Sequence, residues 1–184
     1  MRQSDAGIVL ATAVMYLRLL IIIFVFSHDL AMVLAPPLLA LSALGLAMAL
    51  GWYWIGGPRR TDAGPAAAPA NPLELVTAAT FAVLFVVISI ASAWATLRFG
   101  AAGIYALAAI VGVSDIDPFV LNLAQGDQAQ ITVRVGAGAI MVAASSNNLV
   151  KAVYAIVYSG ARMRAAPAAL AVLAACGIAA AVAW

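Results

Sequence analysis

Long apolar stretches constrain the fold of this chain more than any motif does. Several runs of about 20 residues hold almost no charge, and a helix of that length crosses the roughly 30 Å hydrocarbon core of a bilayer. Hydrophobic residues make up 66% of the 184 residues and charged residues only 9%, which leaves no room for a water-soluble domain. We therefore expect an all-α fold, a polytopic transmembrane helical bundle that forms a single domain over residues 1–184.

Five of the apolar stretches are long enough to predict membrane spans. They cover approximately residues 8–26, 30–54, 71–97, 131–158 and 165–184. The Ala- and Pro-rich segment 56–70 has the composition of an exposed linker. The lipid bilayer is therefore the first partner that the sequence predicts.

A proline breaks the remaining apolar region, residues 101–125. Pro118 has no backbone N–H and disfavours helical geometry at Asp117, so one helix should stop near Val113 and the next should start at Pro118. Each piece is too short to cross a bilayer alone. We expect one broken or re-entrant helix here, with the break at residues 114–118.

Two carboxylates, Asp115 and Asp117, lie in this break between apolar flanks. Irregular backbone is tolerated at membrane depth only inside protein or beside water, and ionisable groups there mark functional sites. Ser114, Asp115 or Asp117 would also cap the second helix. The alternative is a surface loop whose acids do nothing more than cap that helix.

Positive charges in the short loops favour a re-entrant hairpin. If residues 101–125 enter and leave on one side, five arginines share the cytoplasm, as the positive-inside rule requires. These are Arg2, Arg59, Arg60, Arg162 and Arg164. If the region crosses as a sixth span broken at Asp115, the bias disappears. We favour five spans plus a hairpin, in a bacterial-type inner membrane with the N-terminus in the cytoplasm.

The first and last pairs of spans form a weak internal repeat. The units are residues 8–54 and 131–184. Residues 8–54 overlay on residues 141–184 of the second unit, and Arg18 then falls on Lys151. The central span and the broken helix, residues 71–126, lie between the two units. In the five-span arrangement the units are inverted relative to each other, as in many transporters that bind substrate at the midplane.

Two basic side chains lie inside spans, where a charge costs about 2.5 kcal/mol or more on insertion scales. Arg18 lies near the middle of the first span, and Lys151 follows a run of four polar residues, 145–148. Asn147 and Asn148 are four and three residues before Lys151, so both amides can neighbour its ammonium on a helix. The alternative is that these polar groups only hold helices together.

These residues together predict a midplane site for a small ion or solute. The expected binding residues are Ser114, Asp115, Asp117, Asn122, Ser145, Ser146, Asn147 and Asn148, with Arg18 and Lys151 as counter-charges. Asn71 and Glu74 are further candidates, although capping of the third span explains both. A metal ion, if one binds, would use Asp115 and Asp117, and we expect no cofactor.

A small transporter or channel is the leading function, with magnesium as a candidate cargo, and the size and pseudo-symmetry of the chain suit a homodimer. The alternative is a non-transporting membrane subunit whose charge pairs are structural. We do not expect an enzyme, because the sequence has no nucleophile–base pair, no Cys/His metal pattern and no phosphate loop. The loop arginines are orientation signals, so no nucleic-acid partner is expected.

Four motifs resemble a known family. They are Asn-Pro-Leu-Glu at 71–74, Tyr-Ala-Leu-Ala-Ala at 105–109, Ser-Asp-Ile-Asp at 114–117 and Ser-Asn-Asn-Leu-Val-Lys at 146–151. In order and spacing they resemble the integral membrane domain of unknown function 4010, which often follows an MgtC/SapB-type domain. The resemblance implies a link to magnesium transport and an MgtC/SapB-type partner on a separate or missing segment. The family usually has Gly-Leu before its Asp-x-Asp, whereas this chain has Gly-Val-Ser.

Overall fold

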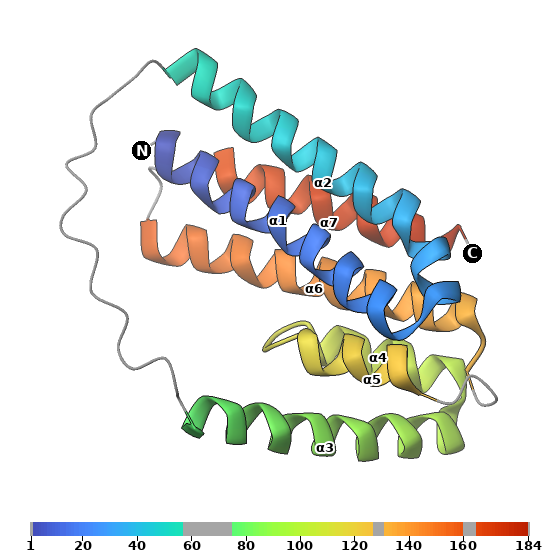
Figure 1. Cartoon of the computed structure of the whole chain (residues 1–184). Helices are drawn as coiled ribbons and strands as arrows, with labels where there is room; N and C mark the ends of the chain where they lie inside the picture. Colours follow the sequence, from blue (N-terminus) through green and yellow to red (C-terminus); the bar gives the residue numbers. More distant parts are fainter. Residues whose placement is uncertain (1, 57–74, 127–130, 160–164, 184) are drawn as a thin grey trace.

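The computed structural model describes residues 2–56, 75–126, 131–159 and 165–183. This part of the chain consists of helices joined by short turns and contains no strand (Figure 1). Its helices are α1 (Arg2–Phe26), α2 (His28–Gly56), α3 (Leu75–Phe99), α4 (Ala101–Val111), α5 (Asp117–Gln125), α6 (Val133–Ser159) and α7 (Ala165–Val182). The all-α prediction is confirmed, and α1, α2, α3, α6 and α7 are each long and apolar enough to cross a membrane.

Some predictions concern residues outside these ranges. They are the linker beyond Gly56, Asn71, Glu74, and the loop arginines Arg59, Arg60, Arg162 and Arg164. Their roles in capping and orientation stay predictions.

Two long helical hairpins form the main body of the bundle. Helices α1 and α2 are antiparallel, as are α6 and α7, and α6 runs opposite to α1 (Figure 1). Only Ser27 lies outside the helices at the first turn. Its hydroxyl accepts a hydrogen bond from the N–H of Leu30 and so caps α2. The two hairpins have the inverted arrangement that the sequence repeat requires, while the repeat itself stays a prediction.

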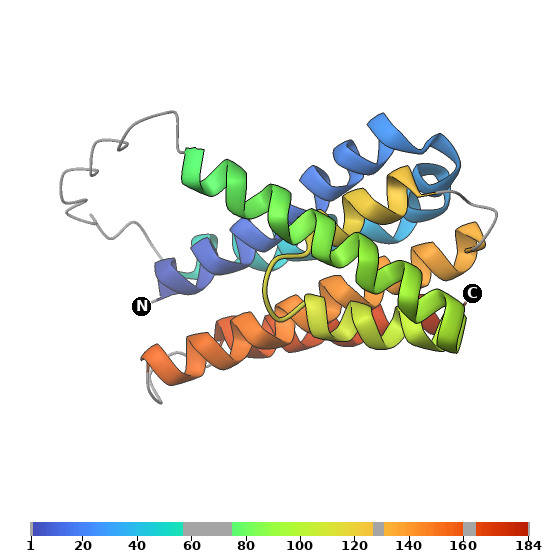
Figure 2. The same ribbon diagram turned by 90° about the horizontal axis from the view of Figure 1, so that it is seen from below.

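Helices α4 and α5 form a re-entrant hairpin against this body. Gly100, with φ +58°, reverses the chain after α3, and α4 returns alongside α3. The chain then breaks, and α5 runs back toward the face from which α4 came (Figures 1 and 2). The 11 residues of α4 extend only about 16 Å, roughly half of a hydrocarbon core. Five helices long and apolar enough to span a membrane and a short helical hairpin are therefore present among the described residues, as the favoured arrangement requires.

The core lies where the hairpin packs between the long helices. Tyr16, Leu19, Ile104, Phe119 and Ile140 are almost completely buried there. The outer surface is also apolar, which a water-soluble bundle would not allow but lipid does. This surface includes Val25, Val76, Leu97, Val157 and Val182, each more than two-thirds exposed. At the hairpin tip, Ile116 and Pro118 are buried in this core, whereas Ser114 and Asp115 are exposed and Asp117 is partly buried.

Candidate functional site

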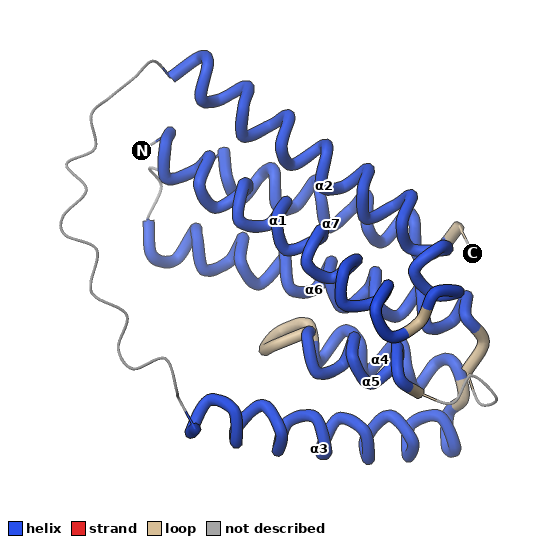
Figure 3. The backbone as a smooth tube through the Cα atoms, viewed as in Figure 1, coloured by secondary structure: helices blue, strands red, loops and turns tan. Residues whose placement is uncertain are grey.

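The break between α4 and α5 lies close to the position predicted from Pro118, which has no backbone N–H. Helix α4 ends at Val111, two residues before the expected stop, and α5 starts at Asp117 with Pro118 in its first turn. The tip is the tan loop beside α4 and α5 in Figure 3. Pro118 suits this position because the first N–H groups of a helix have no partner within it.

The expected capping of α5 is wrong in detail. Its N-cap is Ile116, which makes no side-chain capping bond, because the chain enters α5 in a helical rather than an extended conformation. Asp115 instead accepts the backbone N–H of Asp117 at 3.1 Å, and Ser114 donates its hydroxyl back to the carbonyl of Val111 at 3.3 Å. The two residues therefore stabilise the turn that precedes the helix.

Side chains from α6 satisfy the carbonyl groups that the break leaves without a helical partner. Ser146 donates to the carbonyl of Ala109 at 2.7 Å, and Asn147 donates to the carbonyl of Gly112 at 3.1 Å. Unpaired carbonyls cost several kcal/mol in hydrocarbon, so these two bonds are what allows a helix to end at this depth. Part of the predicted polar cluster on α6 is therefore structural.

Gly112 lets α6 come this close to the break. A Cβ atom at this position would collide with the carbonyl oxygen of Ala143 and the side chain of Ser146. The glycine is thus required by close helix approach, although its own backbone conformation is ordinary right-handed helix.

An ion pair joins the start of α5 to the middle of α1. A single guanidinium nitrogen of Arg18, Nη2, donates to both carboxylate oxygens of Asp117, at 2.5 and 2.7 Å. The Arg18 side chain is 57% exposed and that of Asp117 is 20% exposed. The predicted counter-charge role of Arg18 therefore has a direct geometric basis at Asp117.

A cavity of about 340 Å³ lies beside this pair, between α1, α6 and the hairpin tip. Its polar lining residues are Arg18, Asp115, Asn147 and Lys151. Lys151 donates to the thioether sulfur of Met15 at 3.1 Å, a weak acceptor that leaves the rest of its ammonium for the cavity. The buried amide oxygen of Asn147 has no hydrogen-bond partner among the described residues. The cavity thus offers a cation and an anion, with Asn147 in its wall.

The other predicted binding residues lie away from this cavity. Ser145 donates to the carbonyl of Met141 and packs against Gly177 of α7, and Asn148 donates to the hydroxyl of Tyr16 at 2.5 Å inside the core. Asn122 donates to Ser89 on α3. The eight predicted residues therefore do not converge on one ligand, because neighbouring positions on a helix point in different directions.

The bonds that Asp117 makes to Arg18 limit how a metal ion could bind to Asp115 and Asp117. Both oxygens of Asp117 are bonded to Arg18, so a metal would have to displace the guanidinium. The described residues contain no group of three or more His, Cys, Asp or Glu side chains placed to hold a metal ion. A hydrated Mg²⁺ needs only one or two carboxylates, and Asp115 could supply one.

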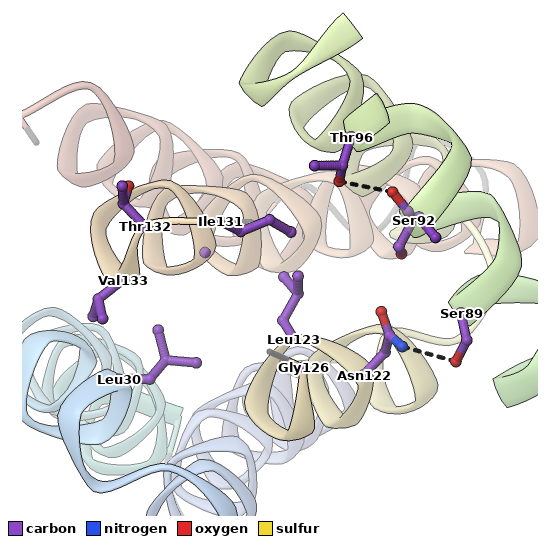
Figure 4. Close-up of a pocket in the computed structure, with 12 residues that line it drawn as sticks. Leu30, Ser89, Ser92, Thr96, Asn122, Leu123, Gly126, Ile131, Thr132 and Val133 are labelled. Atoms are coloured by element: carbon purple, nitrogen blue, oxygen red, sulfur yellow. Dashed lines mark hydrogen bonds between the residues drawn. The ribbon is translucent and has the colours of Figure 1, made fainter. Parts of the chain in front are cut away.

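A second group of polar side chains was missed by the sequence reasoning. Ser89, Ser92 and Thr96 lie on one face of α3, opposite Asn122 of α5 (Figure 4). Their spacing of three and four residues on an otherwise apolar helix is the signal that could have found them.

Long apolar helices around a broken, re-entrant pair define a polytopic integral membrane protein. The chain belongs to the family described as Domain of unknown function (DUF4010), whose model matches residues 1–159. It is 34% identical over 159 residues to an uncharacterized protein of Aquifex aeolicus (strain VF5), a match that covers 86% of this chain and 69% of the relative. No solved structure matches the chain. The family resemblance is confirmed, while the link to an MgtC/SapB-type domain stays a prediction.

Proposed function

We propose that this protein carries a small ion or polar solute across the membrane, and that the cargo binds in the cavity at the tip of the re-entrant hairpin. The observation that supports this most is the ion pair between Arg18 and Asp117, placed where a broken helix meets a polar cavity. Charges inside spans are expensive, and they are typical of substrate and ion pathways.

Exchange of partners is the mechanism that this geometry favours. Positive cargo would compete with Arg18 for Asp117, and negative cargo would bind Lys151 together with the guanidinium that Asp117 releases. In either case the cargo takes the place of one member of the ion pair, and the member that it displaces, Arg18 or Asp117, is left without its partner. Hydrated Mg²⁺, held through water by Asp115 and Asp117, is the cargo that we would test first.

Flux into proteoliposomes tests this proposal. We expect Asp117→Asn to lower uptake of the transported ion at least tenfold, because the variant can no longer alternate between Arg18 and cargo. The matched control is Asp29→Asn, which removes an exposed carboxylate at the start of α2 and should leave uptake unchanged. Uptake that D117N leaves intact, for every cation and anion offered, would exclude the hairpin tip as the cargo site.

A structural role for the same charges is the competing function. The double variant Asp115→Asn, Lys151→Met separates the two. Loss of flux in a protein that still folds and assembles supports transport, whereas loss of assembly alone supports a non-transporting membrane subunit.

The molecular face that contains the Arg18 cavity has features that favour a homodimer. Arg18, Val14 and Asp115 are exposed on this face, and the hydrocarbon of a bilayer does not solvate charge. A two-fold interface requires one patch to complement itself, and this patch carries both signs of charge. We propose that a second copy of the chain covers it, with each Arg18 near the Asp115 of the other copy.

We also propose which side of the membrane the N-terminus faces and which membrane holds the protein. The arginine distribution supports a cytoplasmic N-terminus, and the similarity to a protein of Aquifex aeolicus supports the inner membrane of a bacterium. An accessibility assay on single cysteines at residues 2 and 98 would test the orientation.

A further inference from the structure

A second pocket lies on the other side of the hairpin, away from the cavity that Arg18 lines. It occupies about 170 Å³ between the C-terminal half of α3, the C-terminal end of α5 and the start of α6 (Figure 4). A volume of this size corresponds to roughly five water molecules. The pocket and the Arg18 cavity share no lining residue.

The polar groups of this pocket are hydroxyls and an amide, and none of its described lining residues is charged. Ser89 donates to the carbonyl of Phe85, and Thr96 donates to the carbonyl of Ser92, both at 2.8 Å. Asn122 donates from its amide nitrogen to Ser89 at 2.7 Å. Because these donors are already engaged, the groups left facing the pocket are mainly oxygen lone pairs.

The buried hydroxyl of Ser92 is not explained by helix packing. The residue is 5% exposed, and its hydroxyl has no hydrogen-bond partner among the described residues. Figure 4 shows this hydroxyl and the amide oxygen of Asn122 turned toward each other across the pocket. A buried hydroxyl without a partner costs about 1–3 kcal/mol, so a ligand that coordinates it would recover that cost.

The backbone of α5 adds negative potential at the same place. The helix ends at Gln125 beside the pocket-lining Gly126, and the last carbonyls of a helix have no partner within it. The dipole of the nine-residue helix also places its negative end there. In transporters with broken helices, such half-helix C-terminal ends are places where coupling cations bind.

We propose that this pocket binds a monovalent metal cation. The ligands are the hydroxyls of Ser92 and Thr96, the amide oxygen of Asn122 and carbonyls of the last turn of α5. Divalent Ca²⁺ and Mg²⁺ are bound in proteins with the help of carboxylates, and this pocket has none. Neutral oxygens next to a helix C-terminus suit a singly charged ion, which can be desolvated without a compensating carboxylate.

Thermal unfolding of the purified protein in detergent tests this site. Choline chloride would be replaced stepwise by LiCl, NaCl or KCl at constant ionic strength, with tryptophan fluorescence as the signal. We expect one of the three cations to raise the Tm by about 3–6 °C at ten times its Kd, since only the folded state binds it. An equal response to all three, or a response to none, would overturn the proposal.

The variant Ser92→Ala gives the sharper comparison. Because the hydroxyl has no protein partner, S92A should unfold at the wild-type temperature or slightly above it in choline chloride. Its apparent affinity for the stabilising cation should fall about tenfold or more, the usual effect of losing one bond to a charged group. Full cation stabilisation of S92A would refute the assignment.

The control is Thr80→Val on the same helix. Thr80 is exposed and donates to its own helix at Val76, as Thr96 does at Ser92, so T80V should keep the wild-type response. The readout is binding and involves no flux. A protein that transports nothing can therefore still pass this test, and one that transports through the Arg18 cavity can still fail it.

Discussion

At the scale of single residues, the Arg18–Asp117 pair shows how an expensive charge is kept in an apolar bundle. The two residues are 99 positions apart in the sequence, and the fold brings them within hydrogen-bond distance. In lipid, a lone guanidinium or carboxylate would have neither water nor a partner. We therefore expect each residue to depend on the other more strongly than a surface pair does in water.

A double-mutant cycle measures this dependence. Arg18→Met and Asp117→Asn should each destabilise the protein, because each leaves one charge without its partner. The double variant should be more stable than the sum of the single effects implies, with a coupling of about 1–3 kcal/mol. The measurement is denaturant unfolding in detergent, and additive effects would contradict the expected coupling.

Gly112 is the second residue with a sharp structural role. We expect Gly112→Ala to destabilise the protein by about 1–3 kcal/mol, because its Cβ would meet backbone and side-chain atoms of α6. Gly51→Ala in α2 is the matched control, since nothing lies within 4 Å of a Cβ placed there. Thermal unfolding compares the two, and G51A should be neutral or slightly stabilising.

At the scale of helices, the hairpin depends on α6 as much as on its own sequence. Helix α4 is too short to cross the membrane, and its end would be costly in an apolar bundle without the donors of Ser146 and Asn147. This explains why a polar run occurs in the middle of α6. Two of its four polar residues hold the broken helix, and Asn147 additionally lines the Arg18 cavity.

Hydrogen–deuterium exchange tests this support. Ser146→Ala removes the donor to Ala109, so amides of residues 109–116 should exchange about 5- to 30-fold faster, the equivalent of about 1–2 kcal/mol. Thr80→Val is again the comparison, because it removes a hydroxyl that only contacts its own helix. Unchanged exchange at the break in S146A would show that the hairpin end does not depend on α6.

At the scale of the whole molecule, one face does not suit lipid. Most of the outer surface carries exposed Val, Leu, Ile and Phe, whereas the face around Val14 also carries Arg18 and Asp115. A bilayer tolerates the first kind of surface and penalises the second. This contrast within one molecule is the basis for placing a second copy on that face.

Disulfide-length cross-linking in native membranes tests the dimer. In a Cys176→Ala background, which removes the exposed native thiol, Val14→Cys should give a cross-linked dimer in most of the protein. Val172→Cys on α7 is exposed to a similar degree and should give little. Equal cross-linking at both positions, or none at residue 14, would argue against a dimer through this face.

The sequence was sufficient for the class of fold and for the place of the break. Apolar runs of about 20 residues leave the backbone no alternative to helices in lipid, and a proline without an N–H favours an interruption. The chain is interrupted before Pro118, although α2 continues through Pro36 and Pro37. Both are local rules, so span boundaries and the start of α5 were predicted to within a few residues. The five-span arrangement with a hairpin also followed, since loop charges carry orientation.

Which polar side chains meet was decided by the tertiary structure alone. The spacing on α6 suggested that Ser145, Ser146, Asn147 and Asn148 share one site, but helix geometry turns them toward α7, α4, the cavity and Tyr16. The pocket around Ser92 is formed by four helices whose relative rotation no local pattern records. Sequence periodicity gives each helix its faces, whereas the packing of neighbouring helices determines which faces come together.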